Sequence, residues 1–181
     1  MCYQLLFIEY IIVYYKMNEL NNIKFGYGYI YITNDIDEYI QELEPPALFF
    51  NPTKAEVDLN DTAYVQIYAL EIDSVAGMHL QIQYDWGSVE LDTVEADDFF
   101  FESDYTLLFY EDNDGILDIH LFFVPNENNS VNGTIALCVL VFKTLSLGES
   151  ELKFGSSTKV VNPRNERIQI KEYGRGIIDV Q

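Results

Sequence analysis

Apolar and polar side chains alternate in short runs along most of the chain after Pro46. The run at residues 77–84 is the most regular, because its even-numbered residues are apolar while His79, Gln81 and Gln83 are polar. A two-residue period places alternate side chains on opposite faces of a β-strand. We therefore expect the apolar set of this run to face a core and the polar set to face outward.

Comparable runs follow at short intervals and are separated by Gly, Asn, Asp and Pro. They cover residues 62–72, 88–94, 105–110, 116–124, 134–145, 150–154 and 167–171. Many short strands with turn residues between them are typical of an all-β sandwich. The length of 181 residues suits one domain of this kind.

The chain before Pro46 has a different pattern. Ile36, Tyr39, Ile40 and Leu43 follow the spacing of an amphipathic helix, and the two prolines at 45 and 46 would end it. We predict an N-terminal extension over residues 1–45, with one helix at about 34–44, and a sandwich domain over residues 46–181.

The apolar stretch at residues 5–15 predicts neither a membrane span nor a signal peptide. It is shorter than the roughly 20 residues that a spanning helix needs, it contains Glu9, and no Lys or Arg precedes it. It is either a buried strand, or the true translation start lies elsewhere, for example at Met17.

Acidic residues outnumber basic residues by 30 to 10, which leaves a net charge of −20. Between Lys54 and Lys143 every one of the eighteen charged residues is Asp or Glu. Such a field repels phosphate groups, so we expect no nucleic acid and no anionic membrane as a partner. The acidic surface is either a solvated face or one complementary to a basic protein.

No sequence motif indicates catalysis. The chain lacks a Gly-x-Ser-x-Gly elbow, a His-Glu-x-x-His pair, a glycine-rich phosphate loop and a Cys-x-x-Cys pair. Its two cysteines are too few for a cysteine-based metal framework. Residues 112–115 resemble part of an EF-hand, but Tyr110 and Leu121 occupy positions that need acids, so we predict a turn. We expect no enzyme, no cofactor and no bound metal.

The run at residues 135–142 is apolar on both faces. Strict alternation would point Ala136, Cys138, Leu140 and Phe142 inward, and Ile135, Leu137, Val139 and Val141 outward. Either the N-terminal extension covers that outer face or a partner binds it.

Four segments together resemble the cohesin domain, and the resemblance covers residues 46–181. They are residues 55–62 (AEVDLNDT), 75–85 (VAGMHLQIQYD), 133–143 (GTIALCVLVFK) and 166–181 (ERIQIKEYGRGIIDVQ). Cohesins are nine-stranded jelly-roll β-sandwiches that dock the dockerin modules of secreted proteins, chiefly polysaccharide-degrading enzymes. The resemblance implies this fold, a dockerin-bearing partner and an extracellular or cell-surface setting. It also implies that any calcium belongs to the dockerin.

The resemblance also implies a partner-binding face, built from the outward side of the third, fifth, sixth and eighth strands. Carried onto this chain, it comprises Gly77, His79, Gln81, Gln83, Tyr110, Asp118 and His120, with Leu137 and Val139 added. The family often has Asp or Asn where this chain has Gly77 and His79, and a proline where it has Trp86. If the strands are neighbours, the two histidines would lie close together and binding would change near pH ~6.5.

The expected function is therefore a non-catalytic module that binds a dockerin-containing protein and serves polysaccharide catabolism. One alternative is a carbohydrate-binding module that stacks sugars on Tyr64, Tyr68 or Trp86. Another is a surface domain that forms homodimers through the apolar face of residues 135–141.

Overall fold

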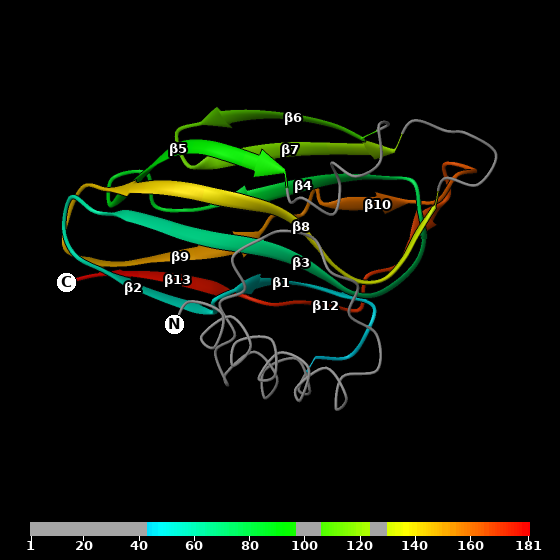
Figure 1. The fold of residues 1–181 in the computed structure, drawn as a ribbon, viewed down its shortest axis with the longest axis horizontal. Helices are drawn as coiled ribbons and strands as arrows, with labels where there is room; N and C mark the ends of the chain where they lie inside the picture. Colours follow the sequence, from blue (N-terminus) through cyan, green and yellow to red (C-terminus); the bar gives the residue numbers. More distant parts are fainter. Residues whose placement is uncertain (1–42, 97–105, 124–129) are drawn as a thin grey trace, which may run out of the picture.

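The computed structural model describes residues 43–96, 106–123 and 130–181 (Figure 1). These residues form β-strands joined by turns, and no helix occurs among them. The all-β prediction is confirmed for this part of the chain, in which no helix is long and apolar enough to cross a membrane. The predicted helix at 34–44 lies outside the described residues except for Leu43 and Glu44.

The described residues contain thirteen strand segments, which form two sheets. They are β1 (Ala47–Asn51), β2 (Lys54–Val57), β3 (Thr62–Val75), β4 (Gly77–Gln83), β5 (Val89–Ala96), β6 (Thr106–Asn113), β7 (Ile116–Phe123), β8 (Val131–Thr144), β9 (Gly148–Phe154), β10 (Lys159–Val161), β11 (Arg167–Ile168), β12 (Glu172–Tyr173) and β13 (Gly176–Val180). The five-stranded sheet has the order β12-β1-β3-β8-β5. The eight-stranded sheet has the order β11-β10-β4-β9-β13-β2, and the β6–β7 hairpin joins it through β7 beside β4.

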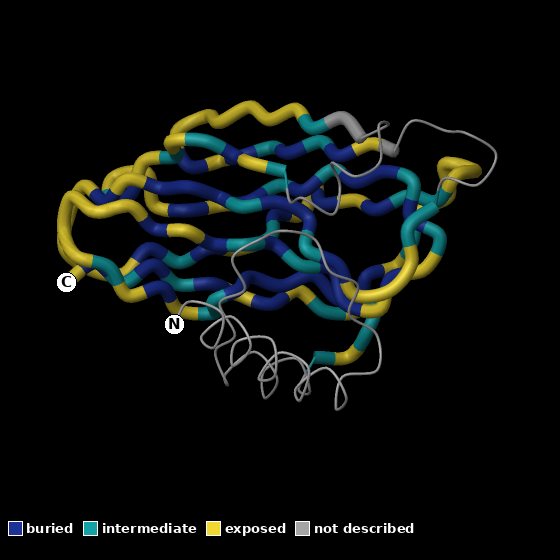
Figure 2. Tube along the Cα trace, viewed as in Figure 1, coloured by how far each residue is buried: buried dark blue, intermediate teal, exposed yellow. Residues whose placement is uncertain are grey.

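The two sheets enclose one apolar core. Phe50, Ile67, Leu80, Ile119 and Phe142 have no exposed surface and belong to a single cluster with residues from both sheets. Figure 2 shows the buried residues along the central strands, and the exposed ones at the turns and along β6. Burying one such side chain stabilises a fold by about 1.5–3 kcal/mol.

The predicted faces of β3, β4 and β7 are confirmed. Met78, Leu80, Ile82 and Tyr84 are buried. Alternation also predicts inward sets for β3 and β7, and their described members are buried: Ala63, Val65, Ile67 and Ala69 on β3, and Leu117, Ile119 and Leu121 on β7. The polar residues between them are half-buried or exposed. Alternation therefore assigns the faces correctly wherever a strand has regular pairing.

β8 departs from regular alternation because it contains a β-bulge. Ile67 pairs with Cys138 while Tyr68 pairs with Ala136, so Leu137 is an extra residue in the strand. Ile135, Leu137 and Cys138 all join the core, whereas Ala136 faces outward with its partner Tyr68. The prediction that Ala136 points inward, and Ile135 and Leu137 outward, is wrong because it assumed an uninterrupted strand.

A two-residue turn joins β6 to β7, which confirms the turn expected at residues 112–115. Asp114 and Gly115 have φ values of 48° and 90°, and Asn113 pairs with Ile116 across the turn. Positive φ at both turn residues matches the twist of a tight hairpin. A Cβ on Gly115 would lie 2.5 Å from the carbonyl oxygen of Tyr84, so the close approach also requires glycine.

Candidate functional site

Strand β7 lies between β4 and β6, and the three strands share one outer face. Residues directly opposite each other in an antiparallel pair point to the same side of the sheet. His79 is opposite His120, which is opposite Phe109, and Gln81 is opposite Asp118. We name this surface the β4–β7–β6 face. It consists of Gly77, His79, Gln81 and Gln83 on β4, Ile116, Asp118, His120 and Phe122 on β7, and Phe109, Glu111 and Asn113 on β6.

The centre of this face is a hydrogen-bonded group around Asp118. Its Oδ1 atom lies 2.7 Å from Nε2 of His79 and accepts a hydrogen bond of 3.2 Å from Nε2 of Gln81. The side chains of His79 and Asp118 remain 30% and 27% exposed. The carboxylate is thus held in one orientation while a partner can still reach it.

The two histidines of the chain stack on each other in this group. The ring centroids of His79 and His120 are 4.5 Å apart, and their planes differ by 12°. The expected proximity of the two imidazoles is confirmed. The ring of Phe122 lies nearly parallel to that of His120, at an interplanar angle of 3° and a centroid distance of 6.2 Å.

Large apolar side chains surround the polar centre and are open to solvent. Phe109 is 56% exposed, Phe122 is 44% exposed, and Ile116 is similarly accessible. Exposed aromatic residues beside a few fixed polar groups are typical of the centre of a protein-binding surface.

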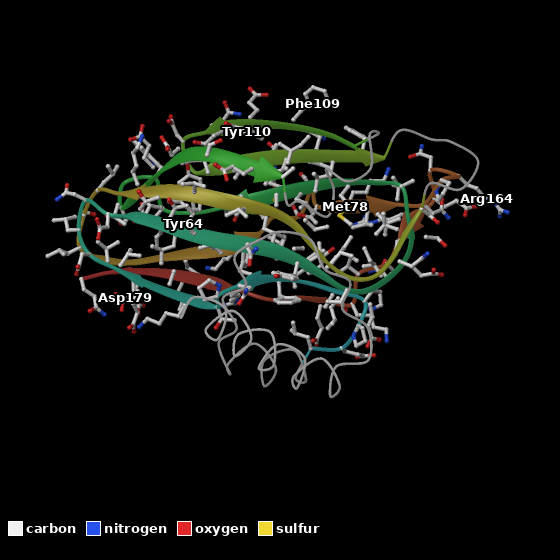
Figure 3. All side chains as sticks on the ribbon, viewed as in Figure 1. Tyr64, Met78, Phe109, Tyr110, Arg164 and Asp179 are labelled. Carbon is white, nitrogen blue, oxygen red and sulfur yellow. The ribbon has the colours of Figure 1, made fainter. Side chains whose placement is uncertain are left out.

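Tyr110 belongs to the opposite side of β6, so its assignment to the outer face is wrong. It is opposite Ile119, whose side chain lies in the core, whereas Phe109 is opposite His120 (both β6 residues are labelled in Figure 3). Tyr110 is 42% exposed although it faces inward, because β6 is an edge strand. The Asp114-Gly115 pair could have identified Phe109, since counting back from a two-residue turn pairs residues 109 and 120.

Leu137 and Val139 are not part of this face. Both lie on β8, between β3 and β5 in the five-stranded sheet, and Leu137 has no exposed surface. The assignment of Leu137 as an outward contact is wrong because of the bulge in β8. Val139 is half-buried on the outer side of the other sheet, so it cannot join a contact centred on Asp118.

Gly77 and Gln83 mark the two ends of β4 on this face. Gly77 is covered by neighbouring side chains, and a Cβ there would lie 3.3 Å from Cδ1 of Phe122 and 3.5 Å from Cγ2 of Val161. It therefore allows close packing and offers no side chain. Gln83 is exposed and lies opposite Ile116.

The acidic and the basic residues of the outer face lie on different strands. Glu111 lies opposite Asp118 on the β6–β7 side, whereas Lys159 of β10 lies opposite His79 and Lys153 of β9 lies opposite Gln83. The β6–β7 side thus belongs to the stretch without Lys or Arg, and the bases come from strands after β8. A partner that covers both sides would need complementary charges of both signs.

The described residues hold no group of three or more His, Cys, Asp or Glu side chains placed to bind a metal ion. The acidic cluster at residues 95–98 contains two residues, Asp97 and Asp98, that lie outside the described part of the chain.

The aromatic candidates for sugar stacking do not form one platform. Tyr64 is exposed on the outer side of β3, but Tyr68 is half-buried and stacks on Phe49 at 5.3 Å. Trp86 follows β4, is exposed, and lies close to Gly115 in the β6–β7 turn. It therefore belongs to the eight-stranded sheet, whereas Tyr64 and Tyr68 belong to the five-stranded sheet.

No protein-family model and no curated protein sequence matches the chain. Solved structures do match it. A non-cellulosomal cohesin from the archaeon Archaeoglobus fulgidus aligns with a TM-score of 0.62 and 12% identity, over 75% of this chain and 91% of the cohesin. The third cohesin ScaC of Acetivibrio cellulolyticus, solved in complex with the ScaB dockerin, matches with a TM-score of 0.62 and 12% identity. The alignment covers 74% of this chain and 97% of that cohesin.

A type II cohesin domain from the cellulosome of Acetivibrio cellulolyticus also matches, with a TM-score of 0.61 and 15% identity over 73% of this chain and 92% of that domain. This chain has a cohesin-like fold. The predicted jelly-roll sandwich of the cohesin type is therefore confirmed. The described residues contain thirteen strand segments, more than the nine strands expected, and three of these segments, β10, β11 and β12, have only two or three residues.

Proposed function

We propose that residues 46–181 form a non-catalytic module that docks a dockerin-bearing protein through the β4–β7–β6 face. The observation that carries this proposal is the oriented Asp118 carboxylate, held by His79 and Gln81 and flanked by exposed Phe109 and Phe122. Cohesin neighbours that were solved in complex with dockerins support the same class of partner.

Binding through this face would combine apolar burial with a few directed hydrogen bonds. Phe109 and Phe122 would be buried against the partner, and such central aromatic residues often contribute about 2 kcal/mol or more each. Asp118 would accept a hydrogen bond from a donor on the partner, and a hydrogen bond to a charged group is worth about 1.5–3 kcal/mol. The acidic β6–β7 side would speed the approach of a basic partner.

We further propose that the partner is an extracellular protein that acts in polysaccharide breakdown. This part of the proposal is supported by the sequence resemblance and by neighbours whose names place them in cellulosomes. Any calcium dependence of the complex would then belong to the dockerin, whose own fold would require the ion.

The test is a binding assay against each dockerin module encoded in the same genome, by pull-down and then by calorimetry. For a dockerin that is retained, the double variant with His79→Ala and Asp118→Ala should bind at least about tenfold more weakly, a loss of about 1.4 kcal/mol. Tyr64→Ala is the matched control, because Tyr64 is 61% exposed on the other sheet. Retention of no dockerin, or equal loss in both variants, would contradict the proposal.

A carbohydrate-binding module is the second candidate, and the exposed Trp86 is the observation in its favour. Gel electrophoresis through cellulose derivatives, xylan and other soluble polysaccharides tests it directly. The dockerin proposal expects unchanged mobility in every gel. Retardation that disappears in Trp86→Ala would favour sugar binding instead.

A further inference from the structure

β6 has one unpaired edge. It pairs with β7 on one side, and no other strand of the described residues pairs with its other side (Figure 1). The tight turn makes Asn113 and Ile116 a hydrogen-bonded pair, and such pairs recur at every second residue of an antiparallel ladder. The N–H and C=O groups of Leu108, Tyr110 and Asp112 therefore point away from β7.

Within the described residues, this edge lacks the usual protection against pairing with another chain. Residues 106–110 (TLLFY) contain no charge and no proline, and Phe109 and Tyr110 are exposed on opposite sides of the strand. Proteins commonly shield an edge strand with lysines, prolines, bulges or a covering segment. Here the acids lie only toward the turn, at Glu111 and Asp112.

We propose that β6 pairs antiparallel with β6 of a second copy of this chain, about a two-fold axis that passes beside Phe109. The two eight-stranded sheets would then form one continuous sheet. The inference does not depend on dockerin binding. It also moves self-association away from the apolar face expected at residues 135–141, because Ile135 and Leu137 lie in the core.

Backbone geometry and side-chain chemistry select the same register. Centring the pair on Phe109 makes Leu108 and Tyr110 of the two copies a hydrogen-bonded pair, which uses the outward-pointing groups. The two Phe109 residues then form a non-hydrogen-bonded pair, in which opposite side chains lie closest.

The charges also fit a second copy in this register. Glu111 lies opposite residue 107 and Asp112 opposite residue 106 of the other copy, so within β6 no acid faces an acid. The acidic turns of the two copies lie at opposite ends of the paired strands. A parallel arrangement would instead place the acids of the two copies side by side, where like charges destabilise pairing.

The dimer should be weak and should become stronger with salt. One pair of eight-residue strands falls below the roughly 1,200 Å² that stable interfaces usually bury. Each copy carries a charge of −20, and added salt screens the repulsion between the copies. Dockerin capture steered by the acidic side would weaken with salt, so the two associations respond in opposite directions.

Sedimentation velocity of the full chain tests the proposal, at concentrations up to about 0.5 mM and at about 0.15 M and 1 M NaCl, where the Debye length falls from about 8 Å to 3 Å. We expect a monomer–dimer equilibrium that shifts toward dimer with concentration and with salt. A chain that stays monomeric throughout would overturn the proposal.

Two variants locate the contact, and one variant controls for charge. Phe109→Lys places like charges opposite each other and should weaken dimerisation by about tenfold or more. Tyr110→Pro removes an outward N–H and leaves the β7 ladder intact, so it should act in the same direction. Ile116→Lys makes the same charge change at an exposed residue of β7, away from the edge, and should leave the dimer in place.

Circular dichroism confirms that each variant is folded before it is compared. Dimers that persist in both β6 variants, or that are lost equally in Ile116→Lys, would refute pairing through this edge. Dockerin binding by the wild-type protein is measured in a separate assay. A negative result for dimerisation therefore does not contradict dockerin binding, and a negative result for dockerin binding does not contradict dimerisation.

Discussion

At the scale of single residues, one side-chain hydrogen bond joins the end of β4 to the edge strand β6 of the eight-stranded sheet. The Tyr84 hydroxyl, at the end of β4, donates to Oδ2 of Asp112 on β6 over 2.7 Å. Its ring packs edge-on against Phe142 in the core, with centroids 5.1 Å apart. This contact ties the edge strand β6 to the core next to the candidate site.

Replacing Tyr84 with Phe should destabilise the fold by about 1 kcal/mol, because the exposed partner Asp112 can turn to water and only the hydrogen bond is lost. The ring and its packing remain. Urea unfolding followed by fluorescence measures the change. An unchanged free energy of unfolding would show that the hydrogen bond contributes nothing to stability.

The same contact predicts how stability changes at high pH. Burial, and then the hydrogen bond to Asp112, raise the pKa of Tyr84 above its ordinary value. The unfolded chain therefore loses this proton at about pH 10, while the folded protein still holds it. The contribution of this group to the free energy of unfolding is fully present below pH 10 and declines as the pH rises above 10. The decline between pH 9 and 11 should be smaller in Tyr84→Phe than in the wild type, and an equal decline would contradict the assignment.

Sequence reasoning succeeded for residues whose strands pair regularly. His79, Gln81, Asp118 and His120 were assigned to one face, and the structure brings them together. The resemblance gives the wrong phase for β6 at Tyr110, whereas counting back from the Asp114-Gly115 turn gives the observed one. Neither the stacking of the two imidazoles nor the cover of Gly77 by Phe122 follows from alternation, since both depend on the register in which β4 pairs with β7.

At the scale of elements, the β6–β7 hairpin sets the register of the candidate site. Gly115 has a φ of 90° and no room for a Cβ. Gly115→Ala should destabilise the fold by about 1–3 kcal/mol, because it combines an unfavourable backbone conformation with a clash. Thermal unfolding measures this loss. Gly133→Ala is a useful comparison, because its φ is also positive but an added Cβ would meet no atom within 4 Å. Equal losses in the two variants would show that crowding plays no part.

The bulge in β8 makes a second prediction at this scale. Leu137→Ala should cost about 2–5 kcal/mol, because it leaves a cavity in the core. Val139→Ala, on the half-buried outer side, should cost less than half as much. Urea unfolding of the two variants distinguishes the bulged strand from an uninterrupted one. In an uninterrupted strand, Leu137 and Val139 would share one face and the two variants would lose similar stability.

Strand patterns alone located most elements but not their irregularities. Alternation was readable in β4 because His79, Gln81 and Gln83 are polar, and in the middle of β7 because Asp118 and His120 are polar. β8 is apolar on both faces, so a single inserted residue leaves no trace in its hydrophobic pattern. The short strand β12 likewise depends on pairing with the distant strand β1 and carries no periodic signal of its own. Of the run expected at residues 167–171, only Arg167 and Ile168 form a strand, β11, which pairs with the nearby β10.

At the scale of the whole molecule, the sandwich separates two surfaces of different character. The β4–β7–β6 face offers a polar centre with exposed aromatic residues, while the five-stranded sheet presents Tyr64 and Val139 on the far side. The all-β architecture followed from spacing alone, but the pairing of strands into sheets required the structure. The surface charge of the acidic stretch follows from the sequence, because no Lys or Arg interrupts it.

Docking through the β4–β7–β6 face can be observed residue by residue in solution. The isotope-labelled chain is titrated with a retained dockerin, and amide chemical shifts are followed in NMR spectra. We expect the amides of His79, Asp118 and His120 to shift or broaden, while those of Tyr64 and Val139 stay in place. Shifts confined to β3 and β8 would contradict docking through this face.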